Sequence, residues 1–174
     1  DTDKIRVDVR SETDRLATVV MCWANPYTID LMAILSLFES SVRKQLRHNF
    51  WSTYDWRRVR VQQECLAQRL REYGVEVLLL ENIGGICSQH YTRDIGFSVD
   101  DVFFVARMGS RYRRSEVRAL GPLLPRLSRV MWLERGRIEG GDVMVWGEKV
   151  LVGLGEATDL AGIEELRRRL VQLG

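Results

Sequence analysis

The sequence predicts an α/β fold assembled from repeated units of strands and a helix. Short apolar runs rich in β-branched residues alternate with longer stretches whose apolar residues recur every three or four positions. The order strand–strand–helix–strand recurs after a longer first version, with a period of about 50 residues that is typical of repeats arranged around an axis. Two motifs that join acidic residues to glycine, at 92–96 and 139–142, stand beside strand-like runs of successive units.

The first unit is predicted as strand–helix–strand with an enlarged helical connection. Residues 17–23 form a short apolar run that favours a buried strand. Helical spacing predicts helices over 29–46 and 55–73, and Gly74 follows the second as a C-cap residue. Residues 75–80 predict the returning strand. The inner face expected for the second helix consists of Val59, Cys65, Leu66 and Leu70.

The next two units follow the shorter pattern. A strand pair is expected over 91–97 and 101–107, then a helix from Arg114 or Ser115 toward Leu124 and a strand over 129–133. A hairpin over 138–146 and 149–154 and a helix over 160–173 form the third unit, which lacks its closing strand. The chain is thus predicted to be a single domain of three units, at approximately 15–85, 86–134 and 135–174.

Composition excludes several classes of function. The 174 residues are 45% hydrophobic, which is enough for one domain with a core. The net charge is +2 and the arginines are interleaved with acids, so a nucleic-acid surface is not expected. Three cysteines without a CxxC spacing disfavour a disulfide scaffold or zinc ribbon and favour a reducing, cytoplasmic compartment. We find no signal peptide and no apolar run of transmembrane length, so no membrane association is expected.

The acidic residues Asp94 and Glu139 pose the question of function. A carboxylate at the start of a buried strand is costly to desolvate unless a cation pairs with it. A planar guanidinium, rich in N–H donors, matches a fork of two carboxylates. The residues alone leave two alternatives open, a bound guanidinium ligand or an internal salt bridge to an arginine of the chain. Arg93 need not be that arginine, because neighbours along a strand point to opposite faces.

The motifs together resemble the guanidine-modifying superfamily, which includes arginine deiminases, dimethylarginine dimethylaminohydrolases and amidinotransferases. The resemblance covers about residues 15–174 and is carried by the following stretches: Tyr91-Thr92-Arg93-Asp94-Ile95-Gly96-Phe97, Arg107-Met108, Arg113 with Glu116, Ile138-Glu139-Gly140-Gly141-Asp142, and Val152-Gly153-Leu154-Gly155. It implies a pentein fold, a closed propeller of five ββαβ units, of which this chain would hold roughly the first three.

The resemblance also implies roles for single residues. Asp94 and Glu139 would hold the substrate guanidinium, and Arg113 would hold the substrate's carboxylate unless it is merely a solvated helix start. Asp142 would fix the turn or the backbone. Thr92, Arg93, Gly140 and Gly141 would lie near the site as structural residues. Ala157 stands where relatives carry an arginine that helps hold the substrate's carboxylate, which puts recognition of α-amino acids in doubt.

The implied reaction proceeds by attack of a cysteine thiolate on the guanidinium carbon, with a histidine moving the proton and no metal or organic cofactor. His48 and His90 do not match the family's histidine context, and Cys22 and Cys65 are expected to be core residues. Cys87, in a glycine loop five residues before Thr92, is the one tempting thiol, although the family's nucleophile comes from elsewhere in the fold. We therefore expect the N-terminal part of a guanidine-modifying hydrolase, inactive by itself. The alternatives are part of an amidinotransferase and a short non-catalytic binding or assembly module.

Two kinds of partner are expected. One is a small molecule with a guanidinium group. The other is a second polypeptide, either another copy of the chain or a complementing C-terminal segment, because an incomplete propeller leaves strand edges unpaired and an apolar side open.

Overall fold

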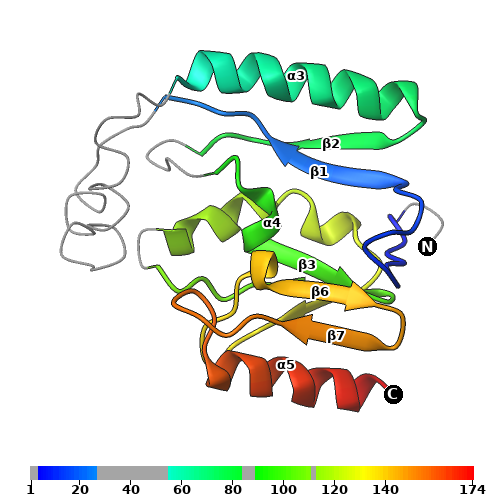
Figure 1. Cartoon of the computed structure of the whole chain (residues 1–174), viewed down its shortest axis with the longest axis vertical. Helices are drawn as coiled ribbons and strands as arrows, with labels where there is room; N and C mark the ends of the chain where they lie inside the picture. Colours follow the sequence, from blue (N-terminus) through cyan, green and yellow to red (C-terminus); the bar gives the residue numbers. More distant parts are fainter. Residues whose placement is uncertain (1–3, 27–54, 84–88, 111–112) are drawn as a thin grey trace. The chain divides into compact units, whose positions relative to one another are not determined.

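The computed structural model describes residues 4–26, 55–83, 89–110 and 113–174. The chain forms two compact units, one of residues 16–90 and one of residues 1–15 with 91–174, and Figure 1 labels their main elements. The helix predicted over 29–46, and with it His48 and Cys87, lies outside the described residues. Within the described ranges, no helix is long and apolar enough to cross a membrane.

The unit of residues 16–90 contains a parallel strand pair joined through a helix. Strand β1 (Thr18–Cys22) pairs in parallel with β2 (Glu76–Leu80), and α3 (Trp56–Glu72) precedes β2. Asp55 caps α3 by accepting hydrogen bonds from the backbone N–H groups of Arg57 and Arg58. Gly74 follows the helix with a φ of +78°, a conformation that favours glycine. The predicted strand–helix–strand order around these residues is confirmed.

The inner face of α3 differs from the prediction. Cys65 and Leu66 are exposed, whereas Ala67 is fully buried and Gln63 is partly buried. Gln63 accepts a hydrogen bond from Ala24 N at 2.7 Å and donates one to the Cys22 carbonyl at 3.0 Å, at the end of β1. Val59 and Leu70 are half-buried, as the predicted face requires, and Gln63 lies at helical spacing with them and satisfies strand-end backbone groups. The prediction is wrong for Cys65 and Leu66. Cys22 is buried, as predicted.

The other unit begins with a three-stranded sheet. Strands β3 (Gly96–Val99) and β4 (Val102–Val105) form an antiparallel hairpin, and β5 (Val130–Trp132) pairs in parallel with β4. Two short 3₁₀ helices, η1 (Arg113–Leu120) and η2 (Leu124–Arg126), connect β4 to β5. The sequence strand–strand–helix–strand is thus present here as β3, β4, η1 and β5.

The same unit continues with a hairpin and the final helix. Strands β6 (Val143–Trp146) and β7 (Lys149–Val152) are antiparallel, and α5 (Leu160–Leu173) follows with Asp159 as its N-cap. The core of this unit comprises Phe97, Val99, Val102, Phe104, Leu133, Ile138, Val143, Val145 and Leu166. Phe97 and Phe104 face each other across the β3–β4 hairpin with their rings stacked 5.5 Å apart. The alternating burial of β6 follows from this packing, since Val143 and Val145 point inward while Met144 and Trp146 are exposed.

The N-terminal residues are part of this second unit. Isolated bridges join Ile5 to Leu127, Val9 to Asp100 and Ser11 to Trp146. Glu12 N also donates to the Val145 carbonyl at 3.1 Å. This segment therefore supplies backbone partners to β6, to the β3–β4 turn and to the residue that follows η2.

One predicted strand is wrong at its start. Residues 91–97 were expected to be extended, but Thr92–Ile95 form the single helical turn α4 and the strand begins at Gly96. This difference matters for the site, because a helical turn and a strand direct the Asp94 side chain differently. The number of units and their arrangement around an axis stay predictions.

Candidate functional site

The two acidic glycine motifs pack against each other. The first lies on α4, and the second includes the 3₁₀ turn η3 (Gly140–Asp142) directly before β6. A side chain at Gly140 would collide with the Arg93 carbonyl oxygen, and one at Gly141 would come within 2.5 Å of Asp94 Oδ1. The glycines are thus required by the close approach of the two turns, which brings motifs 45 residues apart into contact.

Arg93 holds the two turns together. Its Nε donates to the Gly140 carbonyl at 3.0 Å, and its Nη2 donates to the Val143 carbonyl at 2.6 Å. The same guanidinium forms an ion pair with Glu12 at 2.7 Å. The hydrogen bond from Arg93, together with its charge, lowers the pKa of Glu12 below its ordinary value. Arg93 therefore fixes the position of its neighbour Asp94 relative to the turn that follows Glu139.

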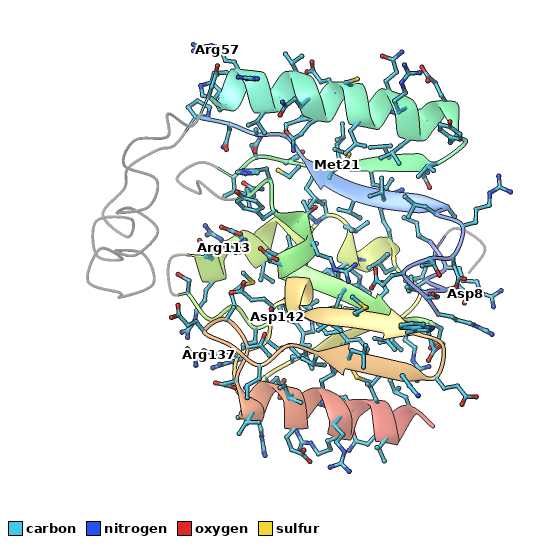
Figure 2. The ribbon with its side chains drawn as sticks, in the orientation of Figure 1. Asp8, Met21, Arg57, Arg113, Arg137 and Asp142 are labelled. Carbon is cyan, nitrogen blue, oxygen red and sulfur yellow. The ribbon has the colours of Figure 1, made fainter. Side chains whose placement is uncertain are left out.

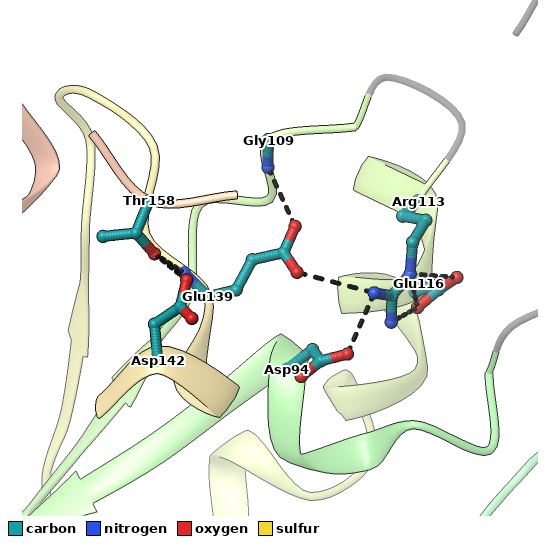
Figure 3. Close-up of polar contacts among 7 residues, drawn as sticks. All are labelled: Asp94, Gly109, Arg113, Glu116, Glu139, Asp142 and Thr158. Atoms are coloured by element: carbon teal, nitrogen blue, oxygen red, sulfur yellow. Dashed lines mark hydrogen bonds and ion pairs between the residues drawn. The ribbon is translucent and has the colours of Figure 1, made fainter. Parts of the chain in front are cut away.

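Asp94 and Glu139 converge on Arg113, at the start of η1. Figure 2 labels Arg113 there and Asp142 at the turn before β6, and Figure 3 shows the contacts. Arg113 Nη1 lies 2.9 Å from Asp94 Oδ2 and 3.5 Å from Glu139 Oε2. The other oxygen of Glu139 accepts a hydrogen bond from Gly109 N at 3.2 Å. One guanidinium nitrogen is therefore shared by the two carboxylates that the sequence singled out.

The opposite edge of the Arg113 guanidinium is held by Glu116. Nε lies 3.1 Å from both Glu116 oxygens, and Nη2 lies 2.9 Å from Oε2. The Glu116 side chain is 0% exposed, against 12% for Arg113, 11% for Glu139 and 23% for Asp94. The cluster is therefore closed at Glu116 and accessible to solvent toward Asp94.

The charges of this cluster perturb one another. Burial raises the pKa of Glu139, and the positive charge of Arg113 and the Gly109 hydrogen bond offset that effect only in part. Burial likewise raises the pKa of Glu116 despite its bonds to Arg113. Burial by itself would lower the pKa of Arg113, but the bonds and charges of Glu116 and then Asp94 raise it, so this guanidinium stays charged. Three carboxylates surround a single cation.

Asp142 faces away from that cation. Its Oδ2 accepts a hydrogen bond from Thr158 Oγ1 at 2.6 Å, and Thr158 Oγ1 in turn accepts one from Glu139 N at 3.2 Å. The Asp142 carbonyl accepts a hydrogen bond from Gly153 N at 2.8 Å. The structure thus places Asp142 where it orders the backbone that carries Glu139. Thr158, which is fully buried, is a site residue that the sequence reasoning missed.

The structure contains one of the two alternatives left open by the sequence, the internal salt bridge. An internal arginine does pair with Asp94 and Glu139, and it is Arg113. The view of Arg113 as a solvated helix start is wrong, because its side chain is only 12% exposed. Glu116, noted in the motif without a role, is the residue that holds Arg113. A signal for this pair was present, since residues three apart on a helix are neighbours.

The other candidate residues that the structure describes make none of the contacts of this cluster given above. Cys22, Cys65 and His90 belong to the unit of residues 16–90, and the cluster belongs to the other unit. The Ala157 backbone packs on Gly109, because a side chain at Gly109 would lie 3.0 Å from the Ala157 carbonyl oxygen. In the part of the chain that the structure describes, no group of three or more histidines, cysteines or acids is arranged to hold a metal ion.

The sequence matches the family model described as arginine deiminase over residues 86–173, which include the whole cluster. It is 29% identical over 115 residues to the N(G),N(G)-dimethylarginine dimethylaminohydrolase of Streptomyces coelicolor. That alignment covers 65% of this chain and 45% of the hydrolase.

Two solved structures show that the fold is shared more widely. A dimethylarginine dimethylaminohydrolase from Pseudomonas aeruginosa in complex with citrulline superposes with a TM-score of 0.71 at 16% identity, over 90% of this chain and 57% of that one. An inosamine-phosphate amidinotransferase from Streptomyces griseus superposes with a TM-score of 0.65 at 16% identity, over 94% of this chain and 60% of that one. The chain therefore spans about half the length of the relatives it matches, with the mixed α/β fold that they share.

Proposed function

The chain belongs to the arginine deiminase family, within the guanidine-modifying or pentein superfamily, and we propose that it supplies the guanidinium-binding carboxylates of a hydrolase acting on guanidine C–N bonds. One observation carries the proposal. Asp94 and Glu139, the acids that the family resemblance assigned to substrate, are already arranged around a guanidinium, that of Arg113. A pair that accepts this flat cation has the spacing to accept the same group on a ligand.

The roles follow from the geometry. Asp94, the more exposed acid, meets the incoming cation, and Glu139 is aimed by Gly109 N and by the Thr158–Asp142 contact behind it. Two carboxylates hold the guanidinium plane in a fixed orientation, which presents its central carbon to a nucleophile. The position of α4 against η3 is fixed by Arg93, which pairs with Glu12, and by the two glycines of η3. This packing fixes the two carboxylates relative to each other.

The nucleophile is proposed to lie outside this chain. A cysteine thiolate would attack the guanidinium carbon, and the amine would leave with a proton from a histidine. Water would then release the ureido product and regenerate the thiol. Cys22 is buried against Asn82, with its Sγ 3.3 Å from Oδ1, and Cys65 is exposed on α3, so neither has the setting of an activated thiol.

An amidinotransferase remains the second candidate. The observation that favours it is the superposition on the Streptomyces griseus amidinotransferase. In that case an acceptor amine, rather than water, would receive the amidino group. The carboxylate pair would bind the guanidinium in the same way in both reactions. The binding experiment below therefore tests the guanidinium site that the two candidates have in common.

Binding of L-arginine, agmatine and methylguanidine to the purified chain, measured by calorimetry, tests the proposal. We expect Asp94→Asn and Glu139→Gln each to weaken binding at least about tenfold, because each removes a hydrogen bond between charged groups. Glu148→Gln is the matched control, since Glu148 is an exposed acid in the β6–β7 turn. Equal affinity in all four proteins would refute the assignment.

A second test addresses catalysis. The purified chain is expected to release neither citrulline nor ammonia from arginine, methylarginines or agmatine. Turnover that survives replacement of Cys87 would contradict the proposed mechanism. Turnover that this replacement abolishes would identify Cys87 as the nucleophile instead.

A further inference from the structure

Arg113 has the same functional group as the ligand proposed for this site. Its guanidinium presents Nη1 to Asp94 and Glu139, while Nε and Nη2 are committed to Glu116 (Figure 3). The two edges of one planar cation therefore have different partners. The outward edge makes the contacts that a ligand guanidinium would make.

These contacts are unequal in strength. Glu116 is fully buried and makes three contacts of 2.9 to 3.1 Å with Arg113. On the other edge, a single nitrogen serves both remaining carboxylates, and its distance of 3.5 Å to Glu139 is long for a charged hydrogen bond. Breaking the outward contacts is therefore easier than breaking the tether to Glu116.

The outer carboxylates keep unused capacity. Asp94 Oδ2 and Glu139 Oε2 share the single donor nitrogen Nη1 of Arg113, while Asp94 Oδ1 lies against Gly141. Among the described residues, one guanidinium contacts the three carboxylates of this cluster, which leaves a shortage of positive charge. A second cation at Asp94 and Glu139 would correct that shortage without removing the ion pair of Arg113 with Glu116.

We propose that Arg113 is an internal occupant of the guanidinium site, tethered by Glu116, and that an incoming guanidinium displaces its Nη1 edge from Asp94 and Glu139. The inference rests on the proposed function and adds that Arg113 competes with the ligand for the same two carboxylates. The apparent affinity for a ligand is lower than the intrinsic affinity, by the fraction of molecules in which Arg113 has withdrawn. A guanidine ligand must therefore bind strongly enough to displace Arg113 before it can occupy the site.

The test uses methylguanidine, which has no carboxylate for Arg113 to bind, on the full chain. Removing Arg113 alone would leave three buried acids together, so the main variant is Arg113→Met with Glu116→Gln, which removes both charges of the tethered pair. Arg169→Met with Glu165→Gln is the matched control, because it removes a buried acid and its arginine on α5 of the same unit. Methylammonium, a cation without the planar fork, is the control ligand.

We expect the Arg113/Glu116 variant to bind methylguanidine at least about tenfold more tightly than the unmodified chain, and the ligand to raise its melting temperature. The control variant should bind as the unmodified chain does, and adding Asp94→Asn to the main variant should abolish the gain. As a second variant that keeps the positive charge, Arg113→Lys should bind more tightly than the unmodified chain but less tightly than the double variant.

Two failures have different meanings. If the unmodified chain binds methylguanidine and neither the double variant nor Arg113→Lys binds it more tightly, Arg113 is no competitor and this inference alone is overturned. If none of the proteins binds methylguanidine better than methylammonium, both the inference and the proposed guanidinium site are overturned.

Discussion

Two buried clusters of acids and arginines lie in the same unit and differ in their balance of charge. The first, here called the Arg113 cluster, consists of Arg113 with Asp94, Glu116 and Glu139. The second, here called the Glu165 cluster, lies on α5, where Arg168 and Arg169 both pair with Glu165. In the first, one arginine contacts three acids. In the second, two arginines contact the buried Glu165, and Arg169 also lies 3.8 Å from the exposed Glu134.

The difference appears in the acidity of the carboxyl groups. In the Arg113 cluster, burial raises the pKa of Glu139 and Glu116 more than the single guanidinium lowers it. In the Glu165 cluster, burial also acts to raise the pKa of the 3% exposed Glu165, but the bonds and charges of Arg169 and Arg168 outweigh it and the pKa is lowered. A buried acid held by two arginines is satisfied within the chain, whereas a cluster in which three acids share one arginine is suited to receive another cation.

The largest expected difference in stability between the two clusters comes from removing an arginine from each. Arg113→Met removes the one cation that the described residues place among Asp94, Glu116 and Glu139, and it should cost about 3–5 kcal/mol of unfolding free energy. Arg168→Met leaves Glu165 paired with Arg169, and Arg168 is 44% exposed, so its cost should stay below about 1 kcal/mol. Urea denaturation at pH 7 measures both, and equal losses would mean that the two clusters are equivalent structural ion pairs.

The helices and strands could largely be predicted from the sequence where local signals agree. The last helix was expected over 160–173 and is found there, because Asp159 caps it and its apolar residues recur at helical spacing. The α3 face was predicted less well, since the burial of Gln63 depends on the carbonyl of Cys22, 41 residues away. Periodicity counts apolar residues and cannot identify a polar side chain that serves a distant strand.

The residues of the candidate site could be predicted from the sequence, but the contacts between them could not. Asp94, Glu139 and Arg113 were named from the motifs, yet their mutual contacts depend on η1 lying against α4, which no local pattern specifies. The helical turn at Thr92–Ile95 was taken for a strand, because its packing on η3 requires the glycines of a motif far along the chain. Long-range packing, rather than propensity, decided both points.

A moderate effect, of opposite sign in the two clusters, is expected from pH. The raised pKa of Glu139 means that the folded chain binds its proton more tightly than the unfolded chain does. The contribution of Glu139 to stability is therefore fully present below the unfolded pKa, which is near 4.5, and is lost as the pH rises through the folded pKa. The lowered pKa of Glu165 has the reverse consequence, since its contribution is present above about pH 4.5 and is lost as the pH falls through the folded pKa.

Urea denaturation of Glu139→Gln and Glu165→Gln between pH 7 and pH 3.5 measures these contributions. The unmodified chain should gain stability relative to Glu139→Gln as the pH falls toward 4.5. Its advantage over Glu165→Gln, on the order of 1 kcal/mol at pH 7, should disappear below pH 4.5. Parallel pH profiles for the two variants would show that the charge imbalance has no energetic consequence.

The smallest effect is expected from an exposed pair that lies outside both clusters. Arg129 contacts both carboxylate oxygens of Asp101, as Arg113 does those of Glu116, but through the single nitrogen Nη1, at 3.1 Å and 3.0 Å. Both side chains are about half exposed, however, at 46% and 59%, so water and salt screen the attraction. Asp101→Asn should therefore change the unfolding free energy by no more than about 0.5 kcal/mol, and the change should shrink further in 1 M salt. A loss as large as that of Arg113→Met would show that contact of an arginine with both carboxylate oxygens, and not burial with an excess of acids, determines the energetic importance of the Arg113 cluster.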